Sequence, residues 1–394
     1  MKIPTISEQS NLANKVAFVR GGMNVSLDQD GSIEDSFRLD AMLATLEYLQ
    51  KQNARVILCG HIGRKPEETF SSVFDYLKTK LNNVSFDRET FKDVTQETIG
   101  EFSETFEKLV SQVTSGEILL LDNIRQSELE KSNDQNLASH ISQHIDVYVN
   151  EAFPVAHREH CSVNALPKLL STEQKYFGIH FAQEVSEMKS VLNPEHPSLF
   201  VISGNKVNTK LPLITKFLDK YDYLLVGGVI ANTFYKFQDK EVGASIIDDE
   251  IDEQEAQVIR ETLSHPSLVL PQQVVVEKQD GTRETLDVNS VKDTDVIYDI
   301  APESLAAIPF AEIKQALWNG PLGYYEKGYV EGSQTLLEEL SKNVSRVTIG
   351  GGNTVAMANK HNLNREKVFL STGGGSMLDY LADGSLPAID AIIN

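Results

Sequence analysis

The sequence has little that would tie it to a membrane or to an oxidising compartment. Cys59 and Cys161 are its only cysteines, which is too few for a disulfide framework and typical of a reducing cytoplasm. No apolar run approaches the roughly 20 residues that span a bilayer. The first residues, MKIPTISEQSNLANK, lack the apolar segment of a secretory signal. We therefore expect a cytoplasmic protein that does not bind a membrane.

Positive charge is also scarce. The chain has 36 lysine and arginine residues against 57 acidic ones, a formal net charge of −21 at pH 7. Such an excess of negative charge argues against non-specific binding to nucleic acid or to anionic lipid. An anionic substrate would have to be drawn by a local basic cleft, against the field of the whole molecule. We therefore expect small-molecule substrates and no nucleic-acid partner.

Some common ligand-binding motifs are absent as well. There is no GxxxxGK[ST] segment, which excludes a P-loop protein, and no GxGxxG segment that would support a dinucleotide fingerprint. The segments CGH (59–61) and HREHC (157–161) contain thiolate and imidazole groups that could bind zinc. Structural zinc sites, however, usually have two paired short spacings such as CxxC, which these segments do not match. Histidines beside arginines at an anion site, or histidines packed against a sheet, are the other interpretations.

What the sequence does contain is a series of short apolar runs separated by stretches of helical period. In the first half the runs are KVAFVR, ARVILCGH, EILLLDN and DVYVNEAF, and in the second half they are SLFVISG, DYLLVGG, SLVLPQQVVV, ALWNGP, RVTIGGG and KVFLSTGGG. Between the first two, one face of a predicted helix is marked by Leu39, Met42, Leu43, Leu46 and Leu49. Continuously apolar strands that alternate with helices indicate parallel sheets covered on both faces.

A domain boundary is expected near residue 185, since 394 residues suggest two domains. There a helical pattern over 181–192 ends in an Asn-Pro pair, and a new apolar run follows. We predict an α/β fold of two doubly wound parallel-sheet (Rossmann-like) domains, 1–184 and 185–375, joined by a hinge helix. In the second domain, VVVEKQDGTRETLDV has an Asp280-Gly281 turn and is predicted as an inserted hairpin.

Basic side chains follow the predicted strands of the first half. In chain order these strand ends carry Arg20 and Asn24, His61 and Arg64, Arg125, and His157, Arg158 and His160, while Arg38 opens the first long helix. Ligands of open α/β sheets bind just beyond the carboxyl ends of the strands. Guanidinium groups bind carboxylate and phosphate through two parallel hydrogen bonds. Any one of these arginines could be an ordinary surface residue, but several at successive strand ends favour a small polyanionic substrate.

The predicted strands of the second half end in glycines and lysines instead. The segments are SGNKVNTK (Lys206, Lys210), VGG (Gly227, Gly228), WNGPLG (Gly320, Gly323), IGGG and STGGG (Gly373 to Gly375). Glycine lets a phosphate approach the backbone, and lysine brings a mobile charge. In RVTIGGGNTVAM a strand stops at glycines before a helical stretch, which presents bare N–H groups to an anion. One such turn is usually only a turn, but several in one domain indicate a nucleotide.

Together these segments make the chain resemble the phosphoglycerate kinase family from about Lys15 to its end. The segments that carry the resemblance are VRGGMNVSL with DSFRLD, GHIGR, LLLDNIR, DVYVNEAFPVAHREHCS, SGNKVNTK, LWNGPLGYYE, IGGGNT and STGGG. The resemblance implies reversible phosphoryl transfer between ATP and 3-phosphoglycerate, giving ADP and 1,3-bisphosphoglycerate in glycolysis or gluconeogenesis. It also implies Mg²⁺ as a cofactor, a monomer, and bending at the hinge helix that brings the two substrates together.

In that family the first domain holds the acid and the second holds the nucleotide. The resemblance implies substrate contacts at Asn24, Arg38, His61, Arg64, Arg125, His157 and Arg158. It implies nucleotide contacts at Lys206, Lys210, Gly228, Asn319, Glu326, Gly351, Gly352, Asn353 and Thr354. The residues expected to act in catalysis are Arg38, Lys206, Lys210, Gly373 and Gly374. The last segment, 376–394, is expected to pack back on the first domain.

The chain departs from the family pattern at positions that bear on activity. Gly22 and Met23 stand where the family has Asp and Phe, so a carboxylate that should accept a hydrogen bond from the substrate hydroxyl is missing. Asn353 stands where the family has the Asp that binds the metal. Its amide oxygen can still bind Mg²⁺, but more weakly because it carries no formal charge. Further differences are SGNK for Gly-Gly-small-Lys, an inserted Lys65, and Pro154 in place of Gly.

Three interpretations of the function follow. An active but divergent phosphoglycerate kinase is favoured, because Arg38, Lys206, Lys210 and the glycine loops are retained. The alternative is a catalytically impaired relative that binds a nucleotide or a phosphorylated acid, which the two missing carboxylates suggest. The third is a related kinase with a changed acid substrate, which Gly22 and Met23 suggest.

Overall fold

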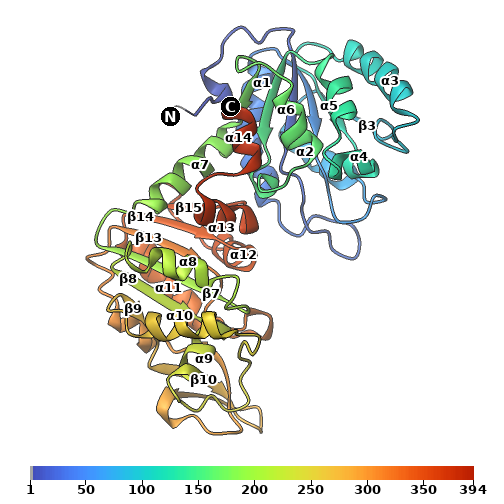
Figure 1. The fold of residues 1–394 in the computed structure, drawn as a ribbon. Coiled ribbons are helices and arrows are strands. Elements are labelled where there is room, and N and C mark those ends of the chain that lie inside the picture. Colours follow the sequence, from blue (N-terminus) through green and yellow to red (C-terminus); the bar gives the residue numbers. More distant parts are fainter. Residues whose placement is uncertain (1–2) are drawn as a thin grey trace. The chain divides into compact units, whose positions relative to one another are not determined.

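The computed structural model describes residues 3–394, and these fold as two compact units (Figure 1). The first unit comprises the chain up to Ser186 together with Gly375–Asn394, and the second comprises Glu187–Gly374. One uninterrupted helix, α7 (Ile179–Leu192), contains the boundary between them. Each unit is built around its own six-stranded parallel sheet.

The sheet of the first unit has the strand order β3-β4-β2-β1-β5-β6, and every pair in it is parallel. Its strands are β1 (Val16–Gly21), β2 (Arg55–Cys59), β3 (Val84–Asp87), β4 (Ile118–Leu121), β5 (Val147–Glu151) and β6 (Lys175–Phe177). The four predicted apolar runs form the four inner strands. The two strands that the apolar pattern missed, β3 and β6, are the edges of the sheet.

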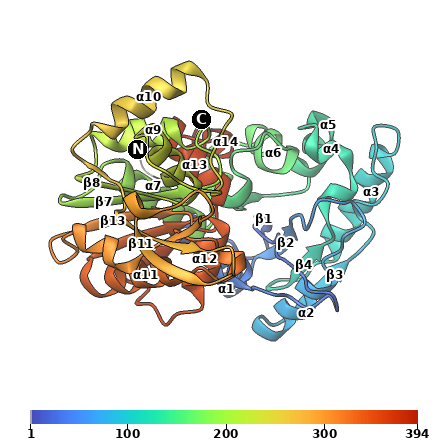
Figure 2. The same ribbon diagram turned by 90° about the horizontal axis from the view of Figure 1, so that it is seen from below.

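Helices cover both faces of this sheet, as its continuously apolar strands require. Figure 2 shows α1 (Phe37–Lys51) and α2 (Ser71–Lys80) on one side, and α4 (Glu128–Lys131), α5 (Gln135–Ser142) and α6 (Leu166–Lys168) on the other. Of the predicted inward face of α1, four residues are fully buried, namely Leu39, Met42, Leu46 and Leu49. Leu43 is only partly buried and lies at the margin of the same core. Helix α3 (Ile99–Gln112) packs against α5.

The sheet of the second unit has the order β15-β14-β13-β7-β8-β9 and is also parallel throughout. Its strands are β7 (Ser198–Gly204), β8 (Tyr223–Gly227), β9 (Leu268–Val269), β13 (Gln315–Asn319), β14 (Arg346–Gly350) and β15 (Val368–Leu370). In Figure 2, α9 (Gly228–Phe237) and α10 (Glu253–Leu263) lie on one side of the sheet and α11 (Glu331–Asn343) on the other. Two further helices of this unit are α8 (Leu211–Leu218) and α12 (Gly352–Asn359). Helix α13 (Gly374–Asp383) begins at the last residue of this unit and otherwise belongs to the first unit.

A small antiparallel sheet is attached to the second unit. It consists of β10 (Gln273–Glu277), β11 (Arg283–Asp287) and β12 (Val296–Ile300), with β10 in the middle. The predicted hairpin is therefore present, and Glu277 pairs with Arg283 on either side of its turn. The apolar run SLVLPQQVVV is not one strand, because its halves, β9 and β10, belong to different sheets. Pro271 stands between them, where a residue without a backbone N–H interrupts pairing.

The chain ends on the first unit. Helix α14 (Pro387–Ile393) packs against α6, β6 and the short helical turn Cys161–Ala165, and Figure 1 shows it in red beside α6. Lys175 of β6, which is almost fully buried, donates a hydrogen bond from Nζ to the carbonyl oxygen of Ala391 at 2.9 Å. This bond satisfies a carbonyl in the last turn of α14, where no intrahelical N–H is available. Within residues 3–394 no helix combines the length and the apolar character needed to cross a bilayer.

Candidate active site

Three loops at the carboxyl end of the first sheet are tied together by their polar residues. Arg38, at the start of α1, donates a hydrogen bond from Nη1 to the carbonyl oxygen of Asn24 at 2.7 Å. The Asn24 side chain in turn accepts from the backbone N–H of Gly63 at 2.8 Å. Arg125 donates to the carbonyl oxygen of Gly63 at 2.8 Å. The loops after β1, β2 and β4 are therefore held in fixed positions, which brings Arg38 and Arg125 to one place.

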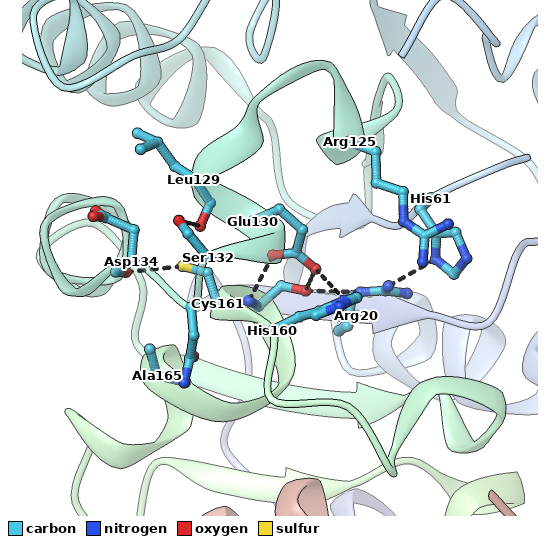
Figure 3. A network of polar contacts seen from close by, with 12 residues as sticks. Arg20, His61, Arg125, Leu129, Glu130, Ser132, Asp134, His160, Cys161 and Ala165 are labelled. Atoms are coloured by element: carbon cyan, nitrogen blue, oxygen red, sulfur yellow. Dashed lines mark hydrogen bonds and ion pairs between the residues drawn. The ribbon is translucent and has the colours of Figure 1, made fainter. Parts of the chain in front are cut away.

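His61 lies within this cluster and is buried. Its Nδ1 is 2.9 Å from Nη2 of Arg20, which is the last residue but one of β1 and is completely buried (Figure 3). Burial lowers the pKa of His61 far below its ordinary value, and the positive charges of Arg20 and Arg125 lower it further. His61 is therefore neutral at physiological pH.

In two other arginines of the cluster, burial disfavours the charged form, although nearby acidic residues oppose this effect. Burial lowers the pKa of Arg38, although Asp35 and Glu184 oppose that effect. The pKa of Arg125 is also lowered by burial first, and then by the positive charges of Arg20 and Arg158. Guanidinium groups that crowd one another in this way favour a bound anion, because an anion relieves both the repulsion and the desolvation.

The other predicted substrate residues lie on two different loops. His157 is half-buried, and burial followed by the charge of Arg158 lowers its pKa. Its Nδ1 has no hydrogen-bond partner among residues 3–394. Its Nε2 would lie 3.7 Å from a Cβ placed on Gly375, at the start of α13. Arg158 is exposed and is close enough to Arg125 to affect its pKa. Arg64 is exposed as well, and its place in the site stays a prediction.

The second unit contains a cavity of about 540 Å³ beside the carboxyl ends of its strands. Three residues predicted to contact a nucleotide line it, namely Gly228, Glu326 and Asn353. Residues outside the quoted motifs also line it, among them Tyr235, Tyr298 and Asp299, and so does Tyr324 of the segment LWNGPLGYYE. The volume is in the range of small-molecule and cofactor sites. Aromatic rings give the cavity an apolar wall of the kind that binds a flat, unsaturated ring.

Two helix N-termini lie together near the cavity. Gly351 has φ 93°, a value that glycine adopts without strain, and it precedes α12. A Cβ placed on Gly374, at the start of α13, would lie 3.9 Å from the backbone nitrogen of Gly352, at the start of α12. Thr354 is fully buried, and its Oγ1 has no partner among the described residues. Backbone N–H groups at two adjacent helix starts form a site that suits phosphate.

Lys210 stands next to the end of β13. Its Nζ donates to Oδ1 of Asn319 at 2.7 Å, and burial lowers its pKa to about 8. The neighbouring Gly320 has φ 95°, and a Cβ on it would lie 2.2 Å from the carbonyl oxygen of Ser203. The WNGP motif thus allows β13 to end close to β7 and to present Asn319 to the lysine. Lys206, by contrast, is exposed.

The position where the family pattern expects an acid is occupied by an amide with a definite partner. Nδ2 of Asn353 donates to Oε1 of Glu326 at 2.8 Å, so the amide oxygen is the atom that could ligate a cation. Among residues 3–394 there is no group of three or more His, Cys, Asp and Glu residues that could hold a metal ion. The protein therefore offers a divalent cation few ligands of its own, and an anionic ligand would have to supply most of the others.

Some residues of these sites were not predicted as site residues. Arg20 was noted only as a strand end, and Ser162 only as the last residue of the segment DVYVNEAFPVAHREHCS. Glu130, which accepts a hydrogen bond from Ser162, carries no motif signal. Glu130 lies in an acidic segment, SELEK, that is typical of a solvated helix, yet its side chain is fully buried. Burial raises the pKa of Asp299, which lines the cavity, to about 7. Only its tertiary surroundings distinguish it from the chain's many other acids.

Comparisons with known proteins agree on one family. The sequence profile of the family described as phosphoglycerate kinase matches residues 7–384. The phosphoglycerate kinase of Coprothermobacter proteolyticus is 32% identical over 404 residues, which cover 100% of this chain and 99% of that protein. The protein named phosphoglycerate kinase 3, cytosolic, of Arabidopsis thaliana is 32% identical over 396 residues, which cover 98% of this chain and 97% of the relative.

Solved structures give the same result. The structure of phosphoglycerate kinase from Coxiella burnetii matches with a TM-score of 0.83 and 29% identity, covering 100% of this chain and 99% of the other. Phosphoglycerate kinase from Pyrococcus horikoshii matches with a TM-score of 0.80 and 24% identity, which supports the fold alone. The predicted α/β fold class is confirmed by these matches. The chain therefore belongs to the phosphoglycerate kinase family.

Proposed function

We propose that this chain catalyses the reversible transfer of the γ-phosphoryl group of ATP to the carboxylate of 3-phosphoglycerate, giving ADP and 1,3-bisphosphoglycerate. Members of its family are phosphotransferases, so the predicted function and enzyme class are confirmed at that level. The comparisons support an enzyme over the alternative of a binding protein. A reduced activity, suggested by Gly22 and Asn353, stays a prediction.

The observation that carries the proposal is the cationic cluster at the end of the first sheet. Arg38 and Arg125 are anchored there through Asn24 and Gly63, and both lie close enough to neutral His61 to lower its pKa. The chain has a net charge of −21, so its overall field repels anions, and the cluster can attract an anion only at short range. It suits a small substrate with two anionic ends, and 3-phosphoglycerate has a carboxylate and a phosphate. We infer that His157 and Arg158 contact the same substrate.

The nucleotide is proposed to bind to the second unit. Its base and ribose would occupy the cavity lined by Tyr298 and Glu326, and its phosphates would lie at the starts of α12 and α13. Lys210 and the more exposed Lys206 would supply positive charge along the phosphate chain. The buried hydroxyl of Thr354 would find there the partner that it lacks within the protein.

The chemistry needs little covalent help from the protein. A carboxylate oxygen of the acid attacks the γ-phosphorus, the bond to the bridging oxygen breaks, and ADP leaves with that electron pair. The nucleophile is already charged, so no general base is required. Charge develops on the equatorial oxygens of the transferred group, and fixed cations stabilise it. Arg38 and Lys210 are the proposed cations, and the backbone N–H groups of Gly373 and Gly374 are proposed to assist them. The Gly373 N–H donates to the Ser371 hydroxyl oxygen at 3.2 Å and would exchange this acceptor for the transferred group.

Magnesium is proposed to bind mainly to the phosphates of the nucleotide. The residues present fit this role, because Asn353 offers one amide oxygen and no cluster of acidic ligands lies among the described residues. When bound, Mg²⁺ neutralises charge on the phosphate oxygens. The chain's own contribution is to fix Asn353 through its hydrogen bond to Glu326. We expect a weaker magnesium site than an aspartate would provide.

The two substrates are proposed to bind to different units. Transfer then requires the units to approach each other and to exclude water, and bending at α7 is the proposed movement. We also propose that the chain acts as a monomer in the cytoplasm and serves glycolysis or gluconeogenesis. The cytosolic relative from Arabidopsis thaliana supports that location.

A coupled spectrophotometric assay with ATP, 3-phosphoglycerate and excess Mg²⁺ tests the proposal. We expect turnover that depends on all three components. Nucleotide binding is measured in parallel by calorimetry on the same preparation. Normal nucleotide affinity without detectable turnover would refute the active enzyme and favour a binding protein. Turnover with another phosphorylated acid, but not with 3-phosphoglycerate, would favour the changed substrate that Gly22 and Met23 suggest.

A further inference from the structure

A buried chain of four polar side chains runs from Glu130 to His61 (Figure 3). The backbone N–H and the hydroxyl of Ser162 both donate to the Glu130 carboxylate, at 2.8 Å and 2.7 Å. Arg20 donates from Nε to the Ser162 hydroxyl oxygen at 2.9 Å, and its Nη2 is 2.9 Å from Nδ1 of His61. Glu130, Ser162 and Arg20 are each completely buried. The four residues come from α4, the turn Cys161–Ala165, β1 and the loop after β2.

In this series of hydrogen bonds, the chemistry of the side chains fixes which group donates and which accepts. The single hydroxyl hydrogen of Ser162 goes to Glu130, so its oxygen can only accept from Arg20. A guanidinium group has five N–H donors and no acceptor, and it stays protonated in proteins. Nδ1 of His61 must therefore accept the hydrogen bond from Arg20, and it cannot itself carry a hydrogen. In a neutral imidazole the hydrogen is then on Nε2.

We propose that Arg20 is a positioning residue that fixes His61 in the neutral tautomer with its hydrogen on Nε2, so that His61 donates this hydrogen to the anionic substrate. Glu130 and Ser162 act by holding the guanidinium in place. The part that concerns the substrate rests on the function proposed above, whereas the tautomer does not. An arginine thus acts on the substrate through a histidine.

The other charged groups that face His61 work in the same direction. Arg125, from the loop after β4, and Arg38, from the start of α1, both lower its pKa, as does His160 from the loop after β5. Burial and neighbouring arginines lower the pKa of His160 itself to about 4. The acid of the network, Glu130, is separated from His61 by Ser162 and Arg20. A proton on Nδ1 of His61 would face the N–H group of Arg20. Protonation of His61 would therefore break the hydrogen bond between them and add repulsion between two positive charges.

The tautomer can be observed directly in the ligand-free, full-length protein. Histidine is labelled with ¹⁵N, and the two ring nitrogens of His61 are distinguished by their chemical shifts and couplings, with His61→Asn identifying the signals. We expect Nδ1 without hydrogen and Nε2 with hydrogen, unchanged from pH 5 to pH 8.5. A His61 that titrates in this range, or that carries its hydrogen on Nδ1, would overturn the proposal. This measurement needs no variant of Arg20.

Ser162→Ala tests the chain of bonds with a small change. It removes the acceptor of Arg20 Nε and leaves the guanidinium free to turn, so we expect His61 to show both tautomers and a measurable titration. The KM for 3-phosphoglycerate should rise about tenfold, with kcat changed less and the KM for ATP unchanged, as for the loss of one hydrogen bond to a charged group. Ser304→Ala is the matched control, since it removes a buried, doubly bonded hydroxyl in the second unit. If His61 keeps its tautomer and does not titrate in Ser162→Ala, the tautomer does not depend on these hydrogen bonds, and the proposal is overturned.

Arg20→Lys completes the series. A lysine keeps the positive charge, but it cannot reach both Ser162 and His61 with a rigid fork. We expect only part of the variant to keep the tautomer with hydrogen on Nε2. Titration of His61 should then make the KM for 3-phosphoglycerate depend on pH, whereas in the natural protein His61 should add no pH dependence to this KM. Should this variant fail to fold, the labelled natural protein and Ser162→Ala decide the question.

Adding 3-phosphoglycerate to the labelled protein separates the two parts of the proposal. We expect the Nε2–H signal of His61 to shift on binding, while Nδ1 stays without hydrogen. If the tautomer is as expected but the signal does not respond to a saturating substrate, His61 does not contact the substrate. That result overturns the role of Arg20 in substrate positioning, whereas the proposed function is refuted separately, by the absence of turnover with 3-phosphoglycerate in the coupled assay. If the tautomer is wrong while turnover is normal, only the inference about Arg20 fails.

Discussion

Lys210 is the residue for which the structure predicts opposite effects on activity and on stability. Burial lowers the pKa of its ammonium group from 10.5 to about 8, which means that folding makes the charged form less favourable. At about 1.4 kcal/mol for each pH unit, the cost of keeping this charge in the folded protein at pH 7 is about 3 kcal/mol. Its hydrogen bond to Asn319 stabilises the folded protein by roughly 1 kcal/mol and offsets part of this cost. Lys210→Met should therefore raise the free energy of unfolding by about 2 kcal/mol.

The dependence of this effect on pH has a definite sign. Below pH 8 both the folded and the unfolded chain hold the proton, so the full cost is present. Between pH 8 and 10.5 the unfolded chain holds more protons than the folded one, and the stability of the natural protein rises with pH. Lys210→Met lacks this rise. The gain in stability of Lys210→Met should thus be largest near neutral pH and should be absent at pH 10.5, where only the lost hydrogen bond, worth roughly 1 kcal/mol, remains and disfavours the variant.

Differential scanning calorimetry of the two proteins without ligand measures the effect. For a unit of this size, 1 kcal/mol corresponds to roughly 2–4 °C in Tm, so we expect the transition that reports on the second unit to move up by roughly 4–8 °C. In the coupled assay the same variant should lose nearly all turnover. Lys206→Met is the matched control for stability, because that lysine is exposed and should change the unfolding free energy by less than about 0.5 kcal/mol. A lower Tm for Lys210→Met, or a gain that persists at high pH, would refute the assignment of a buried, destabilised charge.

The remaining predictions concern the metal, the acid site and a glycine. Asn353→Asp should lower the Mg²⁺ concentration that gives half the maximal rate, because a charged ligand replaces an amide; an unchanged requirement would place the ion elsewhere. Arg38→Ala should lower kcat/KM by roughly 100-fold or more while nucleotide affinity stays the same, and Arg88→Ala, an exposed arginine of the same unit, should have no effect. Gly320→Ala should destabilise the second unit by about 2 kcal/mol or more, because its Cβ would lie 2.2 Å from a backbone oxygen; a normal Tm would contradict the described turn.

Local patterns in the sequence were sufficient for most of the fold. The inner strands of both sheets are continuously apolar, since helices cover both faces, and such runs are visible without any partner. The helix after β1 was visible because its core-facing leucines recur with helical spacing. The edge strands β3 and β6 were missed for a physical reason. Val84–Asp87 is only partly buried, and Lys175–Phe177 begins with a lysine that is satisfied by the distant α14.

The candidate sites also combine features that a local sequence pattern reveals with features that depend on contacts between distant segments. The glycine loops are proposed to act through the local backbone, so their motifs can be read along the chain. The hydrogen bond between the Lys210 and Asn319 side chains, by contrast, joins residues that are 109 positions apart. The hydrogen bond between Asn353 and Glu326 could not be foreseen, because it joins the start of α12 to a turn 27 residues earlier in the sequence. The cavity wall formed by Tyr298 and Asp299 has no motif at all.

By itself, the sequence determined the family, the alternation of strands and helices, and which strand ends carry cations and which carry glycines. Only the tertiary structure decided which of these groups face each other and which are buried. Arg20, Glu130 and Ser162 illustrate the reason. A buried ion can be tolerated only when groups from distant segments satisfy every one of its hydrogen bonds, and that condition is met by three-dimensional placement rather than by any spacing along the chain.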